Sequence, residues 1–150
     1  MSEYYETKAD KFVFRVKKDL LYSKDEVWVK REANGSVRVG VTDFAQWRAD
    51  DLVFAEAQAP GTQVAVGGFI GSYETVKRVQ DILSPVDGQI TEINSLIDSK
   101  PEVINSDPYG EGWVAVIKPT SDLSGLLSAE EYFESMKVKV ADELKKIKGL

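Results

Sequence analysis

Gly71-Ser72-Tyr73-Glu74-Thr75-Val76-Lys77-Arg78-Val79, followed by Ser84-Pro85-Val86-Asp87-Gly88, is the most informative stretch of this chain of 150 residues. The residues on both sides of Lys77 predict two strands, with the lysine on the turn that joins them. Such a turn holds the side chain away from the body of the protein, because the flanking strands fix its direction. We therefore expect Lys77 to be reachable by an enzyme that attaches a prosthetic arm.

The composition excludes most catalytic machinery. The chain has neither Cys nor His, which excludes disulfides, thiolate metal sites, a cysteine nucleophile and a histidine-based triad. A hydrophobic content of 43% is enough for one domain over residues 1–150. The sequence has no apolar run near the roughly 18 residues that span a bilayer, and residues 1–10 do not resemble a secretory signal. We expect a cytoplasmic protein with no membrane partner.

Negative charge is concentrated in the middle of the chain. Residues 25–136 carry eight Lys and Arg against nineteen Asp and Glu, whereas the whole chain has a net charge of −6. A body this acidic repels nucleic-acid phosphates, so no nucleic-acid partner is expected. It can steer the encounter with basic patches on partner proteins, or it can simply keep the protein dissolved.

The remaining patterns predict a mainly β protein with small helices. Two alternating runs, 27–31 and 36–41, meet at Asn34-Gly35, a strong hairpin signal. Thr42-Asp43 predicts the start of a short helix, and Ser99 is expected to cap one or two helical turns that end near Ile104. Many short strands with Gly and Pro turns favour a flattened barrel or sandwich with helices at its margin.

Both ends of the chain extend this core. Alternation over residues 11–17 predicts an additional edge strand within an N-terminal extension, residues 1–20. Ser128-Ala129-Glu130-Glu131 fits a capping box and predicts a C-terminal helix over residues 128–148. An apolar stripe along this helix could lie against the sheet; it comprises Tyr132, Phe133, Met136, Val140, Leu144 and Ile147.

Several motifs, in their order and spacing, resemble the H protein of the glycine cleavage system over about residues 20–136. They are Leu21-Tyr22-Ser23, Val39-Gly40-Val41-Thr42, Asp51-Leu52-Val53, Tyr73-Glu74-Thr75-Val76-Lys77, Leu83-Ser84-Pro85-Val86-Asp87-Gly88, Asn105-Ser106-Asp107-Pro108-Tyr109-Gly110-Glu111-Gly112-Trp113 and Leu126-Leu127-Ser128. The resemblance implies a barrel-sandwich hybrid like that of lipoyl and biotinyl carriers, with lipoic acid covalently attached to Lys77. It also implies that Glu74, in the attachment motif, is read by the lipoate-attaching enzyme.

The resemblance implies a carrier and not an enzyme, with no catalytic or metal-ligating residue of its own. Its expected partners are the lipoate-attaching enzyme, dihydrolipoamide dehydrogenase, and either glycine cleavage enzymes or a heterodisulfide-reductase-like complex. Biotin is the nearest chemical rival, but biotin carriers typically have methionines on both sides of the lysine. Here Val76 and Arg78 occupy those positions.

Departures from the pattern bear on the cargo of the arm. The chain has Asp25-Glu26-Val27-Trp28 where the family usually has His-Glu-Trp, and Arg48-Ala49-Asp50-Asp51 where it has Leu-Gly-Asp. With the N-terminal extension, these changes look like the lipoate-binding H-like proteins of bacterial sulfur oxidation, whose arm would carry bound sulfur intermediates for the heterodisulfide-reductase-like complex. We prefer that interpretation. The alternatives are a glycine cleavage H protein carrying the aminomethyl group, and a non-lipoylated scaffold that binds partners through its acidic face.

Overall fold

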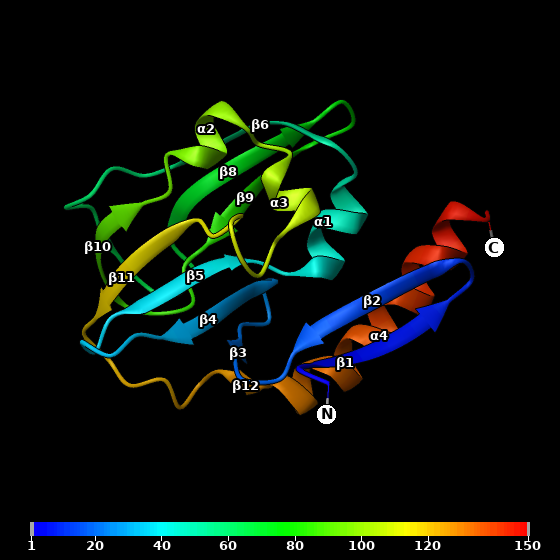
Figure 1. The fold of residues 1–150 in the computed structure, drawn as a ribbon, viewed down its shortest axis with the longest axis horizontal. Coiled ribbons are helices and arrows are strands. Elements are labelled where there is room, and N and C mark those ends of the chain that lie inside the picture. Colours follow the sequence, from blue (N-terminus) through cyan, green and yellow to red (C-terminus); the bar gives the residue numbers. More distant parts are fainter. Residues whose placement is uncertain (1, 150) are drawn as a thin grey trace.

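The computed structural model describes residues 2–149, whose strands form three antiparallel sheets with helices at their margins (Figure 1). The elements are β1 Tyr4–Ala9, β2 Phe12–Lys17, β3 Leu21–Tyr22, β4 Val27–Arg31, β5 Val37–Val41, α1 Asp43–Ala49, β6 Leu52–Ala57, β7 Gln63–Val64, β8 Phe69–Thr75, β9 Val79–Leu83, β10 Gly88–Ile93, α2 Leu96–Ser99, α3 Val103–Ser106, β11 Ala115–Pro119, β12 Leu127–Ser128 and α4 Ala129–Ile147. The predicted mainly β fold with a C-terminal helix is confirmed.

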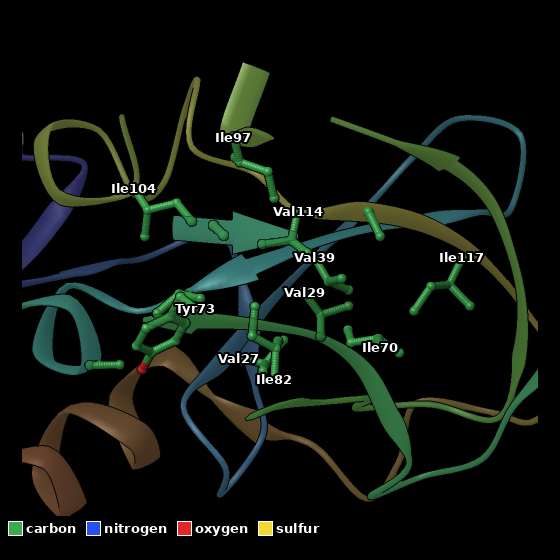
Figure 2. Close-up of a cluster of buried hydrophobic side chains, with 14 of the residues drawn as sticks. Val27, Val29, Val39, Ile70, Tyr73, Ile82, Ile97, Ile104, Val114 and Ile117 are labelled. Atoms are coloured by element: carbon green, nitrogen blue, oxygen red, sulfur yellow. The ribbon is translucent and has the colours of Figure 1, made fainter. Parts of the chain in front are cut away.

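A seven-stranded sheet in the order β12-β3-β4-β5-β11-β10-β7 faces a three-stranded sheet in the order β6-β8-β9. Figure 2 shows the core between them, where Val29 and Val39 of the larger sheet lie close to Ile70 and Ile82 of the smaller one. Each of these side chains is almost fully buried. Burial of one such side chain contributes about 1.5–3 kcal/mol, so this double layer, consistent with the predicted barrel-sandwich hybrid, is the main source of stability.

Local signals placed the central hairpin and the first helix correctly. Strands β4 and β5 pair with Val29 opposite Val39, and Gly35 in the connecting turn has φ +87°. Helix α1 starts after Thr42, whose hydroxyl oxygen accepts a hydrogen bond from the amide of Ala45 at 3.2 Å. Both predictions are confirmed.

A second hydrophobic cluster joins the two ends of the chain. The predicted capping box is present: Ser128 Oγ accepts from the amide of Glu131, and the amide of Ser128 donates to the Glu131 carboxylate. Helix α4 then packs its apolar stripe, apart from Ile147, on the β1–β2 hairpin as well as on β3 (Figure 1). Ile147 is 67% exposed, so the predicted stripe is wrong at its last residue. Its Tyr132 stacks on Tyr22 with ring centroids 4.5 Å apart. The helix therefore contacts the small N-terminal sheet, which the sequence had predicted only in part, because β1 was not expected.

The predicted helix over residues 99–104 is wrong in its position. Ser99 is the last residue of α2, and a separate helix, α3, starts at Val103. The Ser99 hydroxyl donates a hydrogen bond to the carbonyl of Leu96, while Asn94 Oδ1 accepts one from the amide of Leu96. Pro101 separates the two helices, because the residue before a proline avoids the helical conformation.

Gly88 offers a test of how closely β10 and β11 approach. A Cβ atom at this position would overlap the backbone carbonyl oxygen of Lys118, which cannot move without breaking the sheet. We expect Gly88→Ala to lower the free energy of unfolding by about 2–3 kcal/mol and the melting temperature by roughly 4–12 °C, measured by circular dichroism.

Gly125→Ala is the matched control for this substitution. A Cβ atom at Gly125 meets no atom within 4 Å, and its φ lies outside the left-handed region. Its unfolding free energy should change by no more than about 0.5 kcal/mol. Equal melting temperatures for the two variants would contradict the close approach at Gly88.

Candidate functional site

Lys77 lies at the tip of the β8–β9 hairpin, as the sequence predicted. The turn is closed by a backbone hydrogen bond from Thr75 N to Arg78 O at 2.9 Å. The Thr75 hydroxyl oxygen also accepts from the amides of Lys77 and Arg78, at 3.2 and 3.3 Å. This serine/threonine type of turn fixes the backbone, while the Lys77 side chain is 77% exposed.

The ammonium group of Lys77 is loosely paired with Asp50. Its Nζ lies 3.7 Å from Asp50 Oδ2, and both side chains are largely exposed. An ion pair of this kind contributes about 0–1 kcal/mol, so it does not hold the lysine in place. The amine is open to solvent on a rigid turn, and it therefore fits amide linkage to a carboxylic acid such as lipoic acid.

The loop that carries Asp50 is braced by Asn105 of the neighbouring helix α3. Asp50 has φ +74° at the end of α1. Asn105 donates from its side-chain amide to the Asp50 carbonyl at 3.0 Å, and its oxygen accepts from the amide of Leu52 at 2.9 Å. The Asn105-Ser106-Asp107 motif thus fixes the approach to β6, a role that sequence reasoning did not assign to it.

Glu74 lies on β8, and among residues 2–149 no ion pair joins it to Lys77. The register places it opposite Phe54 of β6 on one side and Val79 of β9 on the other. Glu74 precedes Thr75, the last residue of β8, so it belongs to the strand and not to the turn itself.

A narrow hollow runs beside the hairpin, lined by residues of β4, α1, β8 and β9. Glu26 also lines this hollow. Its side chain is buried, and its carboxylate accepts three hydrogen bonds. The donors are Thr42 Oγ1 at 2.8 Å, the Tyr132 hydroxyl, and Lys139 Nζ. The carboxylate is therefore fully engaged by the protein itself, and α4 is tied through it to the start of β4.

Burial governs the ionisation of the phenols around the hollow. Desolvation raises the pKa of Tyr73, and it raises the pKa of Tyr132 well above its usual value, with the Glu26 charge adding to the effect. Both phenols therefore stay protonated at neutral pH, and the Tyr132 hydroxyl is a permanent donor to Glu26.

Residues 2–149 contain no group of three or more His, Cys, Asp or Glu arranged to hold a metal ion. Within the same residues, no helix has the length and apolar character needed to cross a membrane.

Comparison with known proteins identifies relatives over most of the chain. The family model described as "Glycine cleavage H-protein" matches residues 20–139. A glycine cleavage system H protein of Coprothermobacter proteolyticus is 47% identical over 120 residues, which cover 79% of this chain and 94% of that protein. One of Halorhodospira halophila is 43% identical over 131 residues, covering 86% and 98%.

The fold agrees with this match. The crystal structure of a glycine cleavage system H protein from Mycobacterium marinum superimposes with a TM-score of 0.73 and 35% sequence identity, covering 81% of this chain and 99% of that one. Sequence and structure lead to the same conclusion: the chain belongs to the glycine cleavage H-protein family, whose members are lipoyl carriers with lipoic acid attached covalently to a lysine.

Proposed function

We propose that this chain is a cytoplasmic lipoyl carrier of the glycine cleavage system, with its lipoyl group on Lys77 and no bond-making residue of its own. The observation that carries the proposal is the exposed amine at the tip of the β8–β9 hairpin, which forms a loose ion pair with Asp50. Lys77 lies within residues 20–139, which match the family model. The partners would be the lipoate-attaching enzyme, the glycine cleavage enzymes and dihydrolipoamide dehydrogenase.

Attachment follows from the chemistry of the amine. The neutral Nζ of Lys77 attacks the carbonyl carbon of an activated lipoyl donor, the activating group leaves with the bonding electrons, and the proton of the amine passes to solvent. The amide that forms carries no charge, so the pair with Asp50 is lost and the arm is free to leave the surface.

The lipoyl group and the protein chain have separate roles. The bound group supplies a disulfide that opens to two thiols by exchange. The chain supplies position: Thr75 holds the turn, and β8 and β9 direct the arm outward. Cys is absent from the chain, so no thiol of the protein competes for that disulfide.

The relatives favour glycine cleavage over the sulfur-oxidation interpretation that the sequence departures had suggested, since those reported above are named for the glycine cleavage system. Sulfur carriage for a heterodisulfide-reductase-like complex remains a second candidate for one reason. Glu26 and Val27 line the hollow beside the hairpin, at positions where the family pattern has His-Glu. Such a change alters the side chains that lie beside the hairpin.

One assay separates the two cargoes. The lipoylated protein is supplied to glycine decarboxylase, and glycine-dependent transfer of the aminomethyl group is followed by mass. We expect robust transfer, with the lipoylated Lys77 peptide as the acceptor. A fully lipoylated protein that accepts nothing from glycine would contradict the glycine cleavage assignment and favour sulfur.

A further inference from the structure

The N-terminal hairpin leaves one edge of its sheet open. Among residues 2–149, β1 pairs with β2 and with no other strand. In Figure 1, β2 lies on the side of the hairpin that faces α1, and β1 lies on the other side. The backbone groups along an open edge can pair with another chain, so the edge of β1 is a template for association.

The body of the protein covers the opposite edge of the hairpin. The amide of Arg15 on β2 donates to Asp43 Oδ2 at 2.9 Å, and its carbonyl accepts from the Tyr109 hydroxyl at 2.7 Å. The carbonyl of Lys17 accepts from the Tyr22 hydroxyl at 2.7 Å. These side chains take the place of a neighbouring strand along β2, and the hairpin is therefore closed on that side.

The hydrogen bonds between β1 and β2 show which backbone groups of β1 point outward. The amide of Lys18 donates to the carbonyl of Glu3 at 2.9 Å. In an antiparallel ladder, hydrogen-bonded pairs of this kind recur at every second residue. Tyr4, Glu6 and Lys8 lie between these pairs, so their amides and carbonyls point away from β2. The open edge therefore presents the backbone groups of Glu6 and Lys8.

An antiparallel second copy of β1 matches this edge in charge. When two copies pair about a two-fold axis at Thr7, Glu6 of each lies opposite Lys8 of the other, and both pairs exchange backbone hydrogen bonds. Opposite charges that face each other across a ladder stabilise the pairing, whereas like charges destabilise it. An axis at Glu6 or at Lys8 would place two like charges opposite each other. The edge is therefore complementary to itself when the axis lies at Thr7.

The inner face of β1 fits the same register. Tyr5, Thr7 and Ala9 lie on the side of α4, and an axis at Thr7 places Tyr5 of one copy opposite Ala9 of the other, a large ring opposite a small side chain. A groove of about 270 Å³ runs along this side, lined by Thr7 and Ala9 of β1 and by Val140, Ala141 and Leu144 of α4. The second copy of β1 would cover this groove.

The positive charge beside the groove is largely balanced within the chain. Three lysines of α4 also line the groove. Lys137 pairs with Glu134 at 2.7 Å, and Lys148 pairs with Asp10 at 3.8 Å. The third, Lys145, is exposed to water, which screens its charge. Two copies of the groove can therefore approach each other.

We propose that two copies of this chain associate through the open edge of β1, in a two-fold dimer whose shared sheet has the strand order β2-β1-β1-β2. Such a dimer uses the same surface of both copies. The contact is short, so the association is weak and depends on protein concentration. Lys77 belongs to a different sheet, and the inference does not depend on the proposed function.

The test is a charge swap between two variants of the full-length chain, followed by sedimentation equilibrium over a range of concentrations. Glu6→Lys and Lys8→Glu each turn both charge pairs of the dimer into like-charge pairs. We expect each variant alone to raise the dissociation constant of the dimer about tenfold. In an equimolar mixture of the two variants both pairs are again opposite in sign, so the mixed dimer should form within about threefold of the wild-type affinity.

Lys100→Glu is the matched control. It makes the same change of charge at an exposed lysine outside the hairpin, and its dissociation constant should stay within about twofold of the wild type. A wild-type chain that stays monomeric at every concentration would overturn the inference, as would a mixture that associates no better than either variant alone. A variant that failed to fold would not be rescued by mixing, so restored association reports the pairing itself. Lipoylation of Lys77 is measured separately, by intact mass.

Discussion

Lys77→Arg is expected to reduce lipoyl loading of the chain to background while leaving the fold unchanged. A guanidinium group stays protonated, so it offers no neutral amine for amide formation. Since the Lys77 side chain is 77% exposed and Arg can keep the pair with Asp50, the free energy of unfolding should change by less than about 0.5 kcal/mol. Intact mass after incubation with the attaching enzyme and lipoate measures loading, and thermal denaturation measures stability.

Two controls show whether position matters as well as chemistry. Lys100→Arg changes an exposed lysine away from the hairpin and should load like the wild type. Adding Arg78→Lys to Lys77→Arg moves the amine by one residue, out of the orientation that the Thr75 turn sets, and should not restore loading. A Lys77→Arg chain that still gains the mass of a lipoyl group would disprove the site.

Glu26→Ala is expected to lower the free energy of unfolding by about 3 kcal/mol, toward the lower end of the range for breaking a buried ion pair. The substitution leaves the hydroxyls of Thr42 and Tyr132 and the ammonium of Lys139 without their common acceptor. Lys139 is about one-third exposed, so water partly compensates its loss. Urea denaturation, with slope and midpoint fitted together, measures the change.

Glu134→Ala is the matched control for the loss of a Glu–Lys pair. Glu134 pairs with Lys137 at 2.7 Å on the exposed side of α4, and such a pair contributes less than about 1 kcal/mol. If the two alanine variants lose the same stability, Glu26 does not tie α4 to β4 as described.

Residues that are close in sequence allowed most of the fold to be predicted. Asn34-Gly35 defines its hairpin because the turn needs positive φ, and Ser128 with Glu131 defines the start of α4 because the two residues cap each other. Strand β1 was missed although the exposed Glu6 and Lys8 alternate with Tyr5, Thr7 and Ala9, because the half-buried positions include no strongly apolar aliphatic side chain. Its pairing with the neighbouring β2 is local, but its packing on α4 is not, because α4 lies at the other end of the chain.

The candidate site could likewise be predicted only in part. The exposed position of Lys77 followed from the turn and its flanking strands. The environment of Glu26 did not, because Tyr132 and Lys139 are 106 and 113 residues further along the chain. The departure from the family pattern at Asp25-Glu26-Val27-Trp28 marked the position as unusual, but only the fold shows which side chains Glu26 contacts. The position of Glu74 opposite Phe54 likewise depends on strand register.

The most direct test of the account is the mass of the protein isolated from its native host under good lipoate supply. We expect the intact mass to exceed that of the unmodified chain by one amide-linked lipoyl group, and peptide mapping to locate that group on Lys77. An unmodified Lys77 under those conditions would contradict the carrier function and favour the scaffold alternative.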